Sequence, residues 1–83
     1  MHYSYRCKGT CAMAIELDLD EEKKLHNVIF HGGCDGNHKG IEKLVVGMKA
    51  EDIISRIEGV SCGFRATSCP DQLAKALRKA LEE

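Results

Sequence analysis

The sequence predicts an α+β fold: a small antiparallel sheet of two or three strands with about three helices packed on one face. Apolar and polar residues alternate early in the chain, as in strands, whereas apolar residues later recur at helical spacing. Strands followed by helices are typical of α+β domains. The chain has 83 residues, which is the size of a single domain, so residues 1–83 are expected to fold as one unit.

Three segments are predicted to form the sheet. Residues 12–19 alternate between apolar and polar side chains, as a half-buried strand does. The apolar face of this strand is expected to contain Met13, Ile15, Leu17 and Leu19. Residues 25–31 form a second apolar run, and the charged turn before it joins the two strands as an antiparallel hairpin. Residues 3–8 are polar and aromatic, which fits an edge strand.

Three helices are predicted in the second half of the chain. The first ends at Gly47, the second covers residues 50–58 and is closed by Gly59, and the third covers residues 69–81. Residues 60–65 are expected to be extended. The apolar stripes are Ile41, Leu44, Val45 and Met48 in the first helix, Ile53, Ile54 and Ile57 in the second, and Leu73, Leu77, Ala80 and Leu81 in the third.

The segment from Thr67 to Asp71 has the pattern of a capped helix start. Ser68 can serve as the N-cap, and Asp71 can bond back to it as in a capping box. Pro70 is tolerated there because first-turn amides have no intrahelical partner. The sulfur of Cys69 is thereby placed at the positive end of the helix dipole, which favours thiolate over thiol.

Composition excludes several classes of function. The net charge is −1 with both signs mixed along the chain, so there is no basic surface for nucleic acid or for an acidic membrane. No segment has the length and apolarity of a membrane span or of a signal peptide, and a cytoplasmic location is expected. In a reducing compartment, five cysteines indicate metal or redox chemistry rather than structural disulfides.

Four of these cysteines are predicted to form a shared site: Cys11, Cys34, Cys62 and Cys69. Cys11 and Cys34 fall at the same end of the predicted hairpin, and a single turn separates Cys62 from Cys69. Four thiolates suit tetrahedral Zn²⁺ or an Fe–S cluster. The spacing includes no Cys-x-x-Cys pair, and burial of one or two cysteines as small apolar residues is the alternative. Cys7 is expected to stand outside the site.

The histidines and the glycine-rich turn predicted at residues 32–40 carry weaker signals. His31 and His38 flank the cysteine of this turn and could bind a metal or transfer a proton, but a polar residue at a helix start is the simpler interpretation of His38. His2 and His26 are expected on the surface. Phosphate binding is not favoured, because the turn lacks the Gly-Lys-Ser/Thr order of a P-loop and a βαβ setting.

The run from Thr67 to Asp71 resembles the signature of the TSCPD domain. Further motifs that resemble this family are Gly9-Thr10-Cys11, Gly32-Gly33-Cys34, Cys62-Gly63 and Gln72-Leu73-Ala74. The same domain occurs at the C-terminal end of vitamin-B12-dependent ribonucleotide reductases. The resemblance therefore implies a protein accessory to such a reductase or to related redox metabolism. The chain lacks the length of a reductase barrel and is not expected to be an autonomous enzyme.

A more distant resemblance is to the iron–sulfur cluster scaffold proteins. The order of two strands, a Gly-Gly-Cys turn and three helices is similar, and Cys34 and Cys69 match two of that family's cluster cysteines in context. Cys11 lies close to the remaining ligand positions, whereas Cys62 has no counterpart there. This resemblance implies a similar fold and a site of clustered thiolates.

Three functions are compatible with these observations. The first is a metal-binding module that holds Zn²⁺ or an Fe–S cluster through the four cysteines. The second is a thiol redox protein that passes electrons to a partner through Cys62 and Cys69. The third is a partner-binding module whose cysteines are structural. A protein partner is expected, either a reductase or a thiol-redox protein, and a domain this small is also compatible with homodimerisation.

Overall fold

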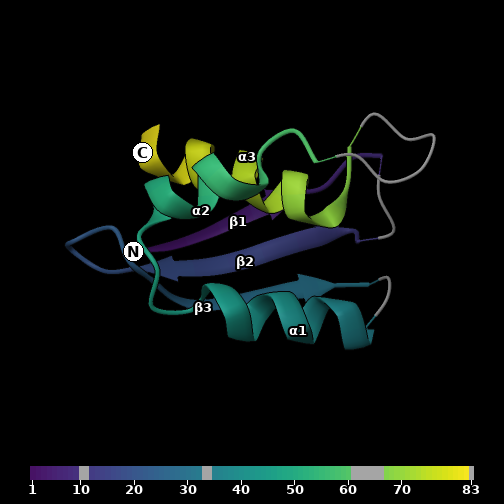
Figure 1. Cartoon of the computed structure of the whole chain (residues 1–83), viewed down its shortest axis with the longest axis horizontal. Helices are drawn as coiled ribbons and strands as arrows, with labels where there is room; N and C mark the ends of the chain where they lie inside the picture. The colour runs from purple at the N-terminus through teal and green to yellow at the C-terminus, as the bar shows by residue number, and fades with distance from the viewer. Residues whose placement is uncertain (10–11, 33–34, 61–66, 83) are drawn as a thin grey trace.

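The chain folds as an α+β domain in the order three strands, then three helices (Figure 1). The computed structural model describes residues 1–9, 12–32, 35–60 and 67–82, without the side chains of residues 35–37. The strands are β1 (His2–Arg6), β2 (Ala14–Leu19) and β3 (Leu25–His31), and the helices are α1 (Asp35–Val45), α2 (Ala50–Ile57) and α3 (Cys69–Glu82). The predicted fold class is therefore confirmed.

The three strands form one antiparallel sheet in the order β1-β2-β3. Ile15 lies at the centre of this sheet, opposite Tyr5 on one side and Phe30 on the other. Alternation along β2 buries Ile15, Leu17 and Leu19. The helices pack on this apolar face, with α1 along β3 and α3 beside β1. Leu73 and Leu77 of α3 are completely buried in the resulting core.

The opposite face of the sheet is polar and open. His2 contacts Asp18 through Nδ1 at 2.8 Å and Glu16 through Nε2 at 3.1 Å, and His31 contacts the other oxygen of Glu16. The hydrogen bond that His2 donates to Asp18 is the largest cause that raises the pKa of His2. His31 and then His2 lower the pKa of Glu16. The helices therefore pack on the apolar face and leave these polar pairs exposed.

Two apolar residues expected in the core lie on the surface instead. Met13 is 72% exposed because β2 begins at Ala14, so Met13 precedes the strand. Leu44 is 78% exposed. The buried side of α1 is set by His38 and Val45, seven positions apart, and Leu44 lies beyond the edge of this stripe.

The glycine-rich turn predicted at residues 32–40 is also largely wrong, because α1 already begins at Asp35. Tertiary packing of the α1 face outweighs the poor helix propensity of its glycines. The extended segment predicted at residues 60–65 lies mostly outside the described residues. Among the described residues, no helix has the length and apolarity to cross a membrane.

Two leucine-to-alanine substitutions test this assignment of core and surface. Leu77→Ala removes a side chain that is fully buried, and we expect it to lower the free energy of unfolding by about 3 kcal/mol. Leu44→Ala removes the same atoms from an exposed position and should change it by less than about 0.5 kcal/mol. Urea denaturation followed by circular dichroism measures both. Equal losses from the two variants would contradict the assignment.

Candidate functional site

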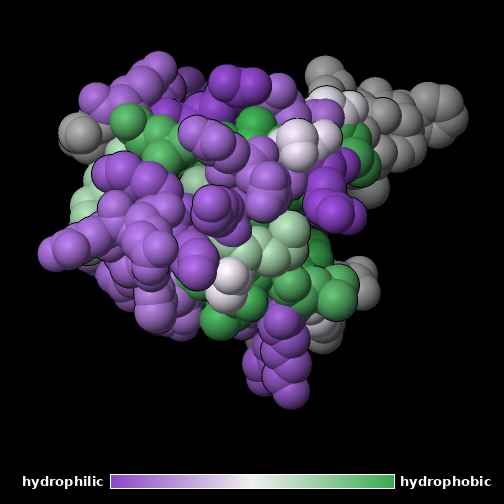
Figure 2. All heavy atoms as spheres, turned by 60° about the vertical axis from the view of Figure 1, so that its left-hand side comes forward, coloured by the Kyte–Doolittle hydropathy of each residue, from purple (hydrophilic) through white to green (hydrophobic). Residues whose placement is uncertain are grey.

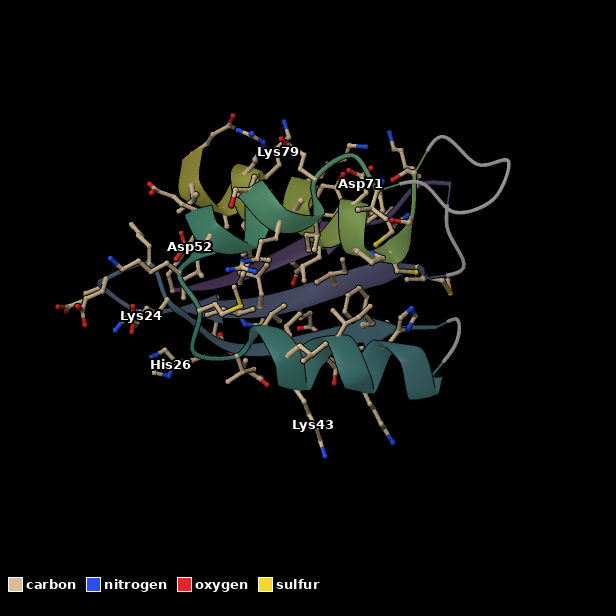
Figure 3. The ribbon with its side chains drawn as sticks, viewed as in Figure 1. Lys24, His26, Lys43, Asp52, Asp71 and Lys79 are labelled. Atoms are coloured by element: carbon tan, nitrogen blue, oxygen red, sulfur yellow. The ribbon has the colours of Figure 1, made fainter. Side chains whose placement is uncertain are left out.

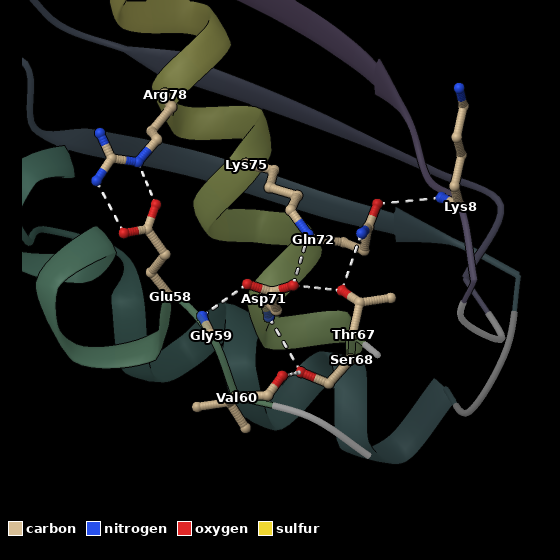
Figure 4. Close-up of polar contacts among 10 residues, drawn as sticks. All are labelled: Lys8, Glu58, Gly59, Val60, Thr67, Ser68, Asp71, Gln72, Lys75 and Arg78. Atoms are coloured by element: carbon tan, nitrogen blue, oxygen red, sulfur yellow. Dashed lines mark hydrogen bonds and ion pairs between the residues drawn. The ribbon is translucent and has the colours of Figure 1, made fainter. Parts of the chain in front are cut away.

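The carboxylate of Asp71 is the centre of a polar network at the start of α3 (Figure 4). Asp71 is only 3% exposed. Its Oδ1 accepts a hydrogen bond from the backbone N–H of Gly59 at 2.7 Å. Its Oδ2 accepts from the ammonium of Lys75 at 2.8 Å and from the hydroxyl of Thr67. Burial raises the pKa of Asp71, but the bonds from Lys75, Thr67 and Gly59 outweigh it and lower the pKa to about 2.

Ser68 is the N-cap of α3, as the sequence predicts. Its Oγ accepts from the backbone N–H of Asp71 at 3.1 Å and donates to the carbonyl of Val60 at 2.5 Å. In a capping box, the Asp71 carboxylate would accept a hydrogen bond from the backbone N–H of Ser68. Here the two carboxylate oxygens accept from Gly59, Thr67 and Lys75 instead. The motif therefore fixes the connection before α3 as well as the helix start.

Gln72 extends the network to the segment that follows β1. Its Nε2 donates to the Thr67 hydroxyl at 3.0 Å, and its Oε1 accepts from the backbone N–H of Lys8 at 3.0 Å. Gly9 packs against the same threonine: a Cβ built on it would lie 3.1 Å from the Thr67 methyl group, and its φ is +76°. Cys7 is thereby held close to the first turn of α3.

Cys69 is the first residue of α3, and its sulfur contacts a histidine from α1. The Nε2 atom of His38 lies 3.1 Å from the Cys69 Sγ atom. The His38 ring is 3% exposed and stacks on Phe30, with ring centroids 4.5 Å apart and an interplanar angle of 17°. Its Nδ1 atom is buried with no hydrogen-bond partner among the described residues. Cys69 is therefore the polar contact that the structure shows for this imidazole.

The thiol and the imidazole have two chemical uses. If Nε2 carries the proton, it donates to the Cys69 sulfur and stabilises a thiolate. If Nδ1 carries it, the Nε2 lone pair accepts from the thiol or binds a metal ion. A buried polar atom without a hydrogen-bond partner lowers the stability of the fold by about 1–3 kcal/mol. The unpartnered Nδ1 atom therefore argues against a purely structural role for His38.

Sequence reasoning undervalued His38. We interpreted it as a polar residue at a helix start, whereas it is the fourth residue of α1 and is buried against the motif. One signal was available, since His38 lies three positions before Ile41 and seven before Val45, on the apolar stripe of the helix. A histidine on such a stripe needs a polar partner inside the fold, and here the partner is Cys69.

Cys7 was expected outside the site, but the structure places it within electrostatic reach of Cys69. Burial, and to a smaller extent negative charge on Cys69, raises the pKa of Cys7 from 9.0 to about 11. No spacing in the sequence pairs them, because β2, β3, α1 and α2 all lie between them in the chain. Cys7 is therefore a protonated neighbour of Cys69 near neutral pH.

The other predicted ligands cannot be placed. Cys11, Cys34 and Cys62 lie outside the described residues, so the shared site of these cysteines with Cys69 stays a prediction. Within the part of the chain that the structure describes, no group of three or more His, Cys, Asp or Glu side chains could hold a metal ion. The described geometry brings together Cys69, His38 and Cys7.

Comparison with known proteins supports one of the two resemblances. The model of the TSCPD domain family matches residues 3–81. No curated protein and no solved structure matches the chain. The likeness to iron–sulfur cluster scaffolds therefore stays a prediction.

Replacing Asp71 with asparagine tests the network. Asp71→Asn keeps the shape but removes the charge, and we expect it to lower the free energy of unfolding by about 2 kcal/mol at pH 7. Because the folded-state pKa is lowered, this contribution is complete above pH 3.8 and disappears as the pH falls towards about 2. Urea denaturation from pH 7 to pH 2 should therefore show the two proteins converging in acid. Glu21→Gln, which removes an exposed turn carboxylate, is the control, and a pH-independent difference would contradict the role of Asp71.

Alkylation tests the environment of Cys7. A pKa raised from 9.0 to about 11 lowers the thiolate fraction at pH 8 about 100-fold. Iodoacetamide should therefore label Cys7 far more slowly in the folded protein than in guanidinium, as peptide mapping by mass spectrometry would measure. Cys69→Ala should speed this labelling only in part, since burial remains. Equal rates in the folded and unfolded protein would refute the assignment.

Proposed function

The chain belongs to the TSCPD domain family, and we propose that it is a small metal-binding module whose donor atoms gather around Cys69. The contact between Cys69 Sγ and His38 Nε2, at 3.1 Å, carries this proposal. Thiolate sulfur and imidazole nitrogen are preferred donors for Zn²⁺, and both also occur in Fe–S centres. Zn²⁺ and an Fe–S cluster are both candidates for the bound metal.

The separation of the two donor atoms is compatible with a metal ion. In a tetrahedral zinc site, bond lengths of about 2.3 Å to sulfur and about 2.0 Å to nitrogen place the donors about 3.5 Å apart. The observed 3.1 Å would need to widen only slightly. In metal sites the second imidazole nitrogen usually donates to a carboxylate or carbonyl, and within the described chain His38 lacks that partner. The two donor types therefore fit a metal site, but among the described residues no group accepts a hydrogen bond from Nδ1 of His38.

With Cys69 and His38 as two donors, the other two ligands of a tetrahedral site would come from Cys11, Cys34 and Cys62. Two of them adjoin described residues close to the motif. Cys34 immediately precedes α1, the helix that carries His38 to Cys69. Cys62 follows two residues after Val60, whose carbonyl binds the Ser68 hydroxyl.

Cys11 also adjoins described residues in the chain. It is two residues from Met13, and the carbonyl of Met13 accepts a hydrogen bond from the backbone N–H of Cys7 at 2.9 Å. Because each residue spans at most about 3.6 Å of chain, none of the three cysteines is far along the chain from the surroundings of Cys69. This proximity supports a shared site.

A thiol redox function is the second candidate, and one observation favours it. Negative charge on Cys69 raises the pKa of Cys7, so the two thiols lie close enough to interact. Oxidation of two thiols to a disulfide would release two electrons and two protons to an oxidised partner. This pair would stand beside the predicted pair of Cys62 and Cys69. A role accessory to ribonucleotide reductase or related redox metabolism, with a reductase or thiol-redox protein as partner, rests on the family alone.

Elemental analysis of untagged protein purified without oxygen tests the metal proposal. We expect about one zinc ion per chain, or iron with the visible absorption of an Fe–S cluster. Cys69→Ser and His38→Gln should both lower the metal content. His26→Gln is the matched control, because His26 is exposed and contacts Asp20 at the far end of the hairpin.

Two outcomes would count against metal binding. The first is wild-type protein with little metal whose unfolding is unchanged by a chelator. The second is a metal content that Cys69→Ser and His38→Gln leave unaltered. If the metal-poor protein forms a disulfide that includes Cys69 in mild oxidant, detected by mass spectrometry, the redox function is favoured instead.

A further inference from the structure

A groove of about 450 Å³ runs between α1 and α2. Its walls are apolar, formed chiefly by Ile41, Val45, Met48, Ile53 and Ile57. Pro70, next to Cys69, lines one part of it, so the groove adjoins the thiol site. Figure 2 shows hydrophobic side chains gathered over the lower part of the molecule, where α1 lies.

The apolar surface continues out of the groove along α1. Leu44 lines the groove and is 78% exposed, and Val46 nearby is 47% exposed. Gly40, one helical turn before Leu44, is exposed, and a Cβ built on it would meet nothing within 4 Å. Glycine is a poor residue in a helix interior, and no packing of the described chain requires it here. A flat glycine beside an exposed leucine lets another backbone approach closely.

The α2 wall carries the charge. Arg56 lines the groove and forms no ion pair with the described residues. Asp52 lies one turn earlier on α2, and these two described residues form no ion pair with each other. A partner that covers the apolar walls would bring its own side chains beside this guanidinium, and a carboxylate is the group that pairs with it best.

We propose that the groove between α1 and α2 binds an amphipathic, acidic helix of a partner protein. Apolar side chains at helical spacing would occupy the groove, the helix backbone would pass over Gly40, and carboxylates would face Arg56. This is the helix-in-groove mode of peptide recognition. The proposal concerns docking and does not depend on which chemistry occurs at Cys69.

Other occupants fit less well. The α1 helix of a second copy would offer Leu44 together with Lys43, which points away from the body of the molecule (Figure 3) and carries the same charge as Arg56. A small apolar molecule would leave Leu44 and Val46 uncovered. A longer amphipathic helix covers both the groove and its exposed rim.

Two synthetic peptides of about 18 residues, long enough for helix formation, test the proposal. Both carry leucines at helical spacing, one with glutamates and the other with lysines at the remaining positions. Fluorescence anisotropy should show saturable binding of the acidic peptide, at least about tenfold tighter than that of the basic one. Leu44→Asp should weaken the acidic peptide about tenfold or more, and Arg56→Glu should reverse the preference between the peptides. Met13→Asp, an exposed apolar residue away from the groove, is the control.

Three results would overturn the proposal. One is the absence of saturable binding, and another is equal binding of the two peptides that Leu44→Asp does not weaken. The third is dimerisation of the chain in sedimentation velocity that Leu44→Asp abolishes, since the groove would then belong to a second copy. Binding that persists in Cys69→Ser would separate docking from the metal and redox functions.

Discussion

A buried carboxylate is the constraint on which the candidate site depends. A charge taken out of water is tolerated only when its hydrogen bonds are made within the protein. Asp71 meets this requirement with a backbone amide from the α2–α3 connection, a hydroxyl from the residue before the helix cap and an ammonium from the next turn of α3. These groups cannot separate without leaving the charge unpaired. The first turn of α3, and with it the Cys69 sulfur, is therefore held in one place.

The elements could be predicted from sequence where local pattern determines them. The hairpin, the α2 helix and the N-cap at Ser68 depend on residues within a few positions of one another, and the structure confirms them. Met13 and Leu44 were misplaced because a shift of one residue at a strand end, or a fraction of a turn on a helix, moves a side chain from core to surface. The alternation itself does not fix where a strand begins.

The site was less predictable because its contacts are distant in sequence. His38 and Cys69 are 31 positions apart, and Lys8 and Gln72 are 64 positions apart. Only the placement of α1 along β3 and of α3 beside β1, on the same face of the sheet, brings them together. The motif from Thr67 to Asp71 indicated the importance of Cys69, but its local reading gave Asp71 a capping role. In the structure its carboxylate instead binds Gly59 and Thr67, which no capping rule would suggest.

The position of α1 has a thermodynamic consequence. This one helix presents His38 to the Cys69 sulfur and, less than two turns later, Leu44 to the groove. A short helix shifts as a rigid body, so an occupant of either place that displaces α1 changes the other as well. By thermodynamic linkage, if a docked helix changes the affinity of the Cys69 sulfur for a ligand by some factor, that ligand changes the affinity for the helix by the same factor. A displacement of α1 would have to disrupt the stacking of His38 on Phe30, and this contact therefore opposes it.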